Sequence, residues 1–176
     1  MSALQQYNLG TVVVWDFIPT GMRDAFMLNY VFWAFKPSID GFQHCGPVIY
    51  IDRTHLNGKY TSTILIAIGI TANNKILPIA FTIVDEQRSA SWTWFLKNLR
   101  QHIVCGQEGV TLISNLGEGI LSAISTMWTN PRHGVHGYHR FCLRHVCANF
   151  YKEFRNTTLR DLVWRAGTLT SAEVEL

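Results

Sequence analysis

Three β-rich runs joined by two short turns constrain the fold of this chain more than any other feature. Asn57-Gly58 and Asn73-Asn74 separate the runs, which cover residues 48–52, 63–70 and 76–84. Asn-Gly is a strong hairpin signal, because both residues tolerate the positive φ angles of a tight turn. The pattern predicts an antiparallel three-stranded meander. Pro78 lacks a backbone N–H and places the third run at an edge of the sheet.

Helical and β-rich segments flank the meander. Apolar residues recur at three- and four-residue steps between Met22 and Phe35, which predicts a helix that Pro37 terminates. After the meander, the chain alternates between helical and strand patterns at residues 89–104, 110–114, 118–128, 138–141 and 143–154. A meander followed by helix, strand, helix and strand is the element order of a ribonuclease H-like α/β fold with a mixed sheet. The element order by itself predicts an α/β fold with a mixed sheet, and the motifs must decide whether that fold is ribonuclease H-like.

The composition indicates one domain with a surface that is poor in charge. Hydrophobic residues make up 48% of the 176 residues and charged residues 15%, well below the ~25% of ordinary soluble domains. This predicts an apolar face that packs on missing sequence or a protein partner, or a self-associating chain. No apolar run reaches the ~18 residues of a membrane span, so no membrane role is expected. Four cysteines without a signal peptide favour free thiols in a reducing compartment.

Asp52 is the first candidate site residue, because it follows an otherwise apolar strand. A carboxylate on rigid backbone suits a metal ligand. Phosphoryl transfer by paired Mg²⁺ ions needs several converging carboxylates, so one aspartate is not sufficient. From the strand pattern alone, an aspartate that caps the following turn through Thr54 or the backbone is the preferred interpretation.

Several motifs in order resemble the catalytic core of plant Mutator-like (MULE) transposases. The first is Cys45 to Tyr60, CGPVIYIDRTHLNGKY, in which an apolar strand leads to Asp52 and then Thr-His-Leu and Gly-Lys-Tyr. Further matches are Ser91 to Leu96, SWTWFL, and Tyr138 to Val146, YHRFCLRHV. The resemblance runs from about Leu4 to the C-terminus. It implies a ribonuclease H-like core that holds Mg²⁺ through an Asp-Asp-Glu triad and cuts DNA.

The resemblance assigns Asp52 to the first aspartate of the triad and exposes a departure at the second. The family has Ser-Asp-Arg after the fourth strand, whereas this chain has Ser114-Asn115-Leu116. Asparagine is nearly isosteric with aspartate but neutral, so it weakens a Mg²⁺ site. No glutamate of this chain is assigned to the third position. Catalysis is therefore in doubt, and Mg²⁺ binding with it.

Cys142 and His145 have the C-x-x-H spacing of the family. Residues three apart share a helix face and can bind one zinc ion, but a structural zinc needs about four ligands. A buried Cys142 and a hydrogen-bonded His145 fit the pattern better than zinc. Arg132, Arg140 and Arg144 belong to the densest basic stretch, which is a candidate DNA contact. An ordinary solvated loop explains that stretch equally well.

These observations predict an N-terminal helical lead-in over residues 1–46, a transposase core over 47–155 and the start of a helical insertion over 156–176. The function that we expect is a nuclear, transposase-derived domain that contacts DNA and has lost cleavage. Two alternatives remain open. One is an active fragment that needs further sequence, and the other is a protein-interaction module that reuses the fold.

Overall fold

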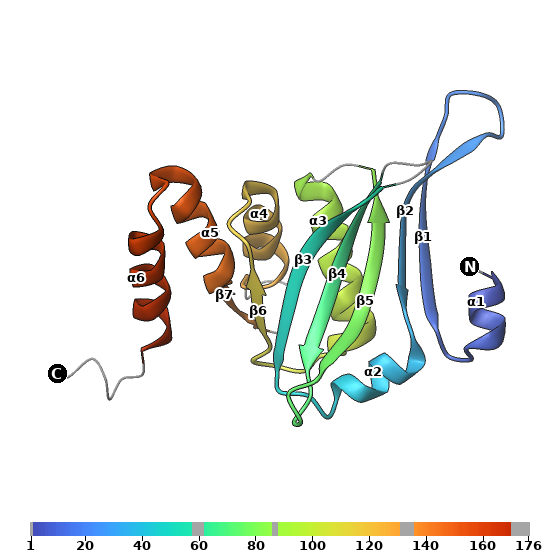
Figure 1. Cartoon of the computed structure of the whole chain (residues 1–176). Helices are drawn as coiled ribbons and strands as arrows, with labels where there is room; N and C mark the ends of the chain where they lie inside the picture. The colour runs from blue at the N-terminus through green and yellow to red at the C-terminus, as the bar shows by residue number, and fades with distance from the viewer. Residues whose placement is uncertain (1, 58–61, 86–87, 131–135, 170–176) are drawn as a thin grey trace.

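The computed structural model describes residues 2–57, 62–85, 88–130 and 136–169 and places one mixed β-sheet at the centre of the molecule (Figure 1). The sheet has seven strands in the order β1-β2-β5-β4-β3-β6-β7. Neighbouring strands run antiparallel from β1 through β2, β5 and β4 to β3. Strand β6 pairs with β3, and β7 with β6, in parallel. The predicted α/β class and its mixed sheet are confirmed.

The strands are β1 Val12–Pro19, β2 Phe26–Ala34, β3 Val48–Leu56, β4 Ser62–Ile70, β5 Ile76–Val84, β6 Thr111–Ser114 and β7 Tyr138–Phe141. The helices are α1 Ser2–Tyr7, α2 Lys36–Phe42, α3 Ser89–Leu99, α4 Glu118–Met127, α5 Leu143–Phe154 and α6 Thr157–Thr168. A π-helical turn, Arg100–Val104, extends α3. The meander and every element predicted after it are therefore present, within a few residues of the predicted bounds.

The hydrophobic core lies between one face of the sheet and helices α3 and α4. Strand β4 shows why: its burial alternates at every residue, as the two-residue period of a strand requires. Leu65 and Ala67 point toward the helices and are fully buried. From α3, Trp92 and Phe95 enter the same core. These two aromatic residues therefore serve packing.

The opposite face of the sheet carries apolar side chains that the core does not include. Antiparallel partners share a face, and the register joins two rows across five strands. We call this the open face and define it by Val13, Trp15, Val31, Trp33, Tyr50, Ile64, Ile66, Ile68, Phe81 and Ile83. The Trp33 and Phe81 rings stack there at 5.3 Å. In Figure 1, α3 and α4 lie behind the strands, and no described helix lies in front of β4 and β5.

The helix predicted between Met22 and Phe35 is wrong, because Phe26–Ala34 forms strand β2. Tyr30 and Phe32 face α3, where both rings approach Trp94, whereas Trp33 faces the other side. A helical period and a strand period both fit so aromatic a segment, and pairing with β1 and β5 decides between them. Residues 1–46 thus contribute two strands to the sheet beside the short helices α1 and α2.

The edge position predicted for β5 is also wrong, because β5 lies between β2 and β4. Pro78 is tolerated for two reasons. The register with β4 shifts between Ala67 and Ile68, next to Pro78. Strand β2 pairs with β5 only over Phe81 to Val84, so the Pro78 end of β5 has no strand on that side. A central strand can therefore contain a proline where its neighbour ends.

Candidate functional site

Asp52 lies within β3 rather than at its end, because β3 continues to Leu56. Its side chain is 53% exposed. The Arg53 backbone N–H donates to Asp52 Oδ1 at 2.8 Å, and Oδ2 lies 3.5 Å from His145 Nε2. The interpretation that Asp52 caps a turn is wrong, since no turn follows it. Asp52 instead presents one carboxylate on a rigid strand.

Asn115 reaches the same place from the end of β6. Asp52, Asn115 and His145 line one hollow of about 390 Å³, together with Asn149 of α5. The parallel pairing of β3 with β6 brings the two positions to one region of the sheet. The Gly117 N–H donates to Asn115 Oδ1 at 3.1 Å, which forms a local turn before α4. The Asn115 amide oxygen therefore already accepts one hydrogen bond from its own loop.

Cys142 and His145 stand at the start of α5, where Cys142 is the N-cap residue. Both line a second hollow of about 660 Å³, which also contains Asp52 and extends over Ile66 and Ile68. Within the described ranges, no group of three or more His, Cys, Asp or Glu side chains could hold a metal ion. His145 Nδ1 is buried without a described hydrogen-bond partner.

The described donors around Asp52 do not fit a pair of Mg²⁺ ions. Such a pair needs several carboxylates at one point, and Asp52 is the only carboxylate of the 390 Å³ hollow. The Asn115 amide is neutral, and an imidazole is a poor Mg²⁺ ligand beside oxygen donors. The site as described is therefore deficient in negative charge for that chemistry.

The two described arginines of the predicted basic stretch, Arg140 and Arg144, do not line the same hollow. Arg144 lines the 660 Å³ hollow, where Arg53 joins it from β3. Arg140 belongs to β7, and its Nη1 donates to its own neighbour's carbonyl, that of His139, at 2.8 Å. Arg132 lies outside the described residues. Arg53 was missed by sequence reasoning, although its place beside Asp52 was the available signal.

A buried serine and a histidine support the loop that carries Asn115. Ser114 is fully buried, and its Oγ lies 2.9 Å from His139 Nε2 and donates to the Asn115 carbonyl at 2.8 Å. Burial lowers the pKa of His139, and the charge of Arg140 lowers it further. His139 is therefore neutral near pH 7 and fixes the backbone at residue 115 through Ser114.

We expect acid to destabilise the domain through His139 and through His102, whose pKa burial also lowers. A folded-state pKa below the unfolded value of about 6.5 means that the unfolded chain binds more protons, so stability falls between about pH 7 and pH 5. Urea unfolding at both pH values measures this. His139→Gln keeps a donor for Ser114 and is expected to reduce the loss, whereas exposed His44→Gln is not. An unchanged loss in His139→Gln would contradict the assignment.

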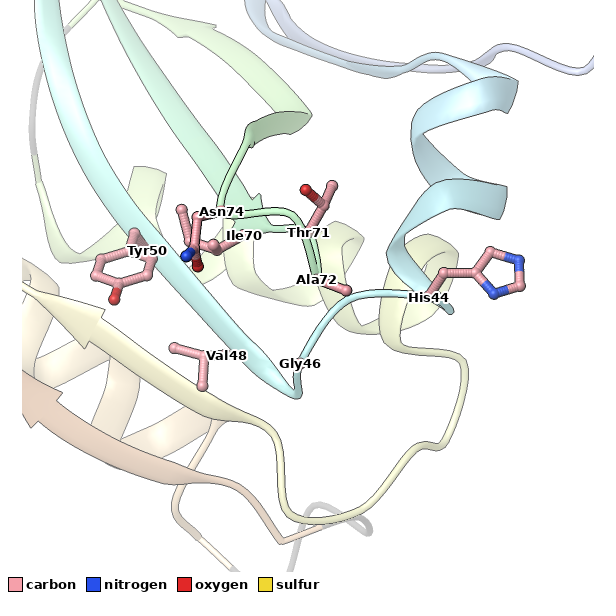
Figure 2. A pocket seen from close by; sticks show the side chains of 8 residues that line it. All are labelled: His44, Gly46, Val48, Tyr50, Ile70, Thr71, Ala72 and Asn74. Atoms are coloured by element: carbon pink, nitrogen blue, oxygen red, sulfur yellow. The ribbon is translucent and has the colours of Figure 1, made fainter.

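Another hollow, of about 350 Å³, lies near the start of β3 and the β4–β5 turn (Figure 2). Its lining residues include Tyr50, Thr71 and Asn74, and no carboxylate is among them. The His44 side chain points away from the other labelled residues. This hollow lacks the charged groups of the Asp52 region, so the candidate site stays at Asp52 and Asn115.

Comparison with models of known protein families shows which family the residues of the candidate site belong to. The model of the MULE transposase domain matches residues 48–149, from the start of β3 into α5 and more than half of the chain. The chain belongs to the MULE transposase domain family. The match includes Asp52, Asn115 and His145, so every described residue that lines the Asp52 hollow lies within this MULE domain.

One relative of the MULE domain is FAR1-RELATED SEQUENCE 10 of Arabidopsis thaliana. It is 23% identical over 146 residues, which are 80% of this chain and 21% of the relative. The chain thus spans about a fifth of the length of that protein. Among the described residues, none of the helices is both long and apolar enough to traverse a bilayer.

Proposed function

We propose that this MULE domain is a transposase-derived, DNA-contacting module that has lost metal-dependent strand cleavage. The observation that carries the proposal is Asn115. It occupies the place beside Asp52 at the end of β6, and its amide oxygen accepts a hydrogen bond from Gly117. One carboxylate with a neutral neighbour is a poor holder of paired Mg²⁺ ions. A ribonuclease H-like core and a nuclear location belong to the same proposal.

The strand order supports the ribonuclease H-like part of the proposal. Strands β5, β4 and β3 form an antiparallel meander, and β6 and β7 add to β3 in parallel, each through one helix. In an arrangement of this kind, Asp52 on β3 and residue 115 after β6 are neighbours although 63 positions separate them in sequence. The topology accounts for a site built from distant segments.

Two exposed arginines support contact with DNA. Arg53 and Arg144 flank Asp52 in the 660 Å³ hollow, one from the sheet and one from α5. Guanidinium groups bind phosphate oxygens well, and each phosphate contact adds a salt-dependent contribution to affinity. The net charge of +3 is compatible with such a partner. A divalent metal is not required for this contact.

Titration of a labelled DNA duplex by fluorescence anisotropy tests the proposal. We expect affinity to fall steeply as salt rises from about 50 to about 200 mM, and Arg144→Gln to reduce the logarithmic salt slope by about one. Lys75→Gln removes one charge at the β4–β5 turn and is the matched control. Salt-independent binding, or no binding at about 50 mM salt, would favour a protein-interaction module instead.

A nicking assay on supercoiled DNA tests the lost cleavage. With Mg²⁺ or Mn²⁺ present, the chain is expected to leave the plasmid intact. Nicking that Asp52→Asn abolishes would show that the site still acts and would favour an active transposase fragment. Nicking that survives Asp52→Asn would be a contaminant and would leave the inactive assignment in place.

A further inference from the structure

We propose that the 660 Å³ hollow beside Asp52 takes an unpaired nucleotide of a DNA strand, with the base on the sheet and the phosphates at the arginines. This inference rests on the proposed DNA contact and narrows its substrate to single-stranded DNA. The volume is that of a small-ligand pocket, for which ~300–1,000 Å³ is usual. The floor of the hollow, its carboxylate and its guanidinium groups each match a different part of a nucleotide.

The floor of the hollow is apolar and half-buried. Tyr50 of β3 pairs with Ile68 of β4 and with Ile113 of β6. Ile66 lies two residues from Ile68 on β4 and shares its face of the sheet. All four line the hollow. An aromatic ring with aliphatic neighbours is a surface on which any base can stack, because every base has a π-face. A duplex presents only base edges and backbone, so it would leave this floor uncovered.

Asp52 presents a hydrogen-bond acceptor at the border of this floor. Its Oδ2 lies 3.5 Å from His145 Nε2, which is longer than the ~2.7–3.2 Å of an N–H···O bond, so this oxygen can accept from a ligand. Each DNA base carries an N–H on its Watson–Crick edge, and that edge is free only in an unpaired base. A phosphate would be repelled by the carboxylate. The base is therefore the part of the nucleotide that matches Asp52.

Two arginines supply positive charge beside the same floor. Arg144 is exposed two residues after Cys142, the N-cap residue of α5. Arg53 of β3 lines both this hollow and the 390 Å³ hollow. Guanidinium groups bind phosphate oxygens well. An apolar peptide would cover the floor but would offer no anion to either arginine, whereas a nucleotide supplies both a flat base and a phosphate.

Anisotropy titration of one labelled strand of about 12 nucleotides, alone and annealed to its complement, tests the proposal. At about 50 mM salt we expect the single strand to bind about tenfold more tightly than the duplex, because stacking adds to the phosphate contacts. Tyr50→Leu removes the ring and is expected to abolish this preference, whereas Tyr50→Phe keeps the ring and the preference. Tyr7→Leu makes the same change at an 82% exposed position of α1 and is the matched control.

The contrary outcomes separate this inference from the DNA contact on which it rests. Equal affinity for the two forms, or tighter binding of the duplex, would overturn the inference and leave the DNA contact standing. Absence of binding to either form would overturn both. A single-strand preference that persists in Tyr50→Leu would mean that the base stacks outside the hollow, which also contradicts the inference. If circular dichroism shows that Tyr50→Leu is unfolded, Tyr50→Val replaces it, because β-branched valine suits a strand.

Discussion

Asn115→Asp is expected to raise the affinity of this MULE domain for Mn²⁺ by at least about tenfold, or about 1.4 kcal/mol. The substitution places a second carboxylate beside Asp52 in the 390 Å³ hollow. An anionic ligand balances the charge of a divalent cation, which a neutral amide cannot do. Aspartate can also accept the Gly117 hydrogen bond, so the loop before α4 should persist. Mn²⁺ titration followed by electron paramagnetic resonance measures the affinity.

Two variants control this experiment. Asn73→Asp makes the same chemical change in the β4–β5 turn and is expected to leave Mn²⁺ affinity near the wild-type value. Asp52→Asn in the Asn115→Asp background is expected to cancel the gain. An equal gain of Mn²⁺ affinity in Asn73→Asp would show that the added net charge alone causes the effect. No gain in Asn115→Asp would mean that residue 115 does not face a metal position, and the explanation for lost cleavage would fail.

Phe32→Ala is expected to lower the free energy of unfolding by about 3–5 kcal/mol. Phe32 is fully buried, and its ring approaches those of Trp94 and Phe95 from α3 at 6.5 and 6.2 Å. Removing the ring leaves a cavity between β2 and α3 that neither element can close. Urea denaturation followed by tryptophan fluorescence and by circular dichroism measures the loss.

Phe26→Ala is the matched control, because Phe26 is 69% exposed at the start of β2. Its expected cost is within about 0.5 kcal/mol. Comparison of Phe32→Ala with Phe26→Ala also distinguishes a strand from a helix in this segment. A helix with Phe26, Tyr30 and Trp33 on its buried face would make Phe26→Ala costly and would leave Phe32 on another side. A larger effect at Phe26 than at Phe32 would therefore contradict the observed β2.

The partners of the site residues explain why the sequence could identify positions but not contacts. Asp52 and Asn115 are recognisable from the motifs around them. Their shared hollow with His145 and Arg53 depends on how β3, β6 and α5 are arranged. The link from His139 through Ser114 to the Asn115 backbone joins two parallel strands, and no local pattern encodes it. Contacts of this kind arise from register, which single segments do not specify.

The sequence by itself determined the meander, the later helices and strands, and the neutral residue at position 115. These features depend on local periodicity, on turn residues such as Asn73-Asn74, and on side-chain chemistry. Only the tertiary structure decided that Phe26–Ala34 is a strand, that β5 lies inside the sheet and that one face of the sheet is left open. For the strand at Phe26–Ala34 and the position of β5, the local pattern permitted two outcomes, and hydrogen bonding with a distant strand selected one. The open face follows from the placement of α3 and α4 on one side of the sheet.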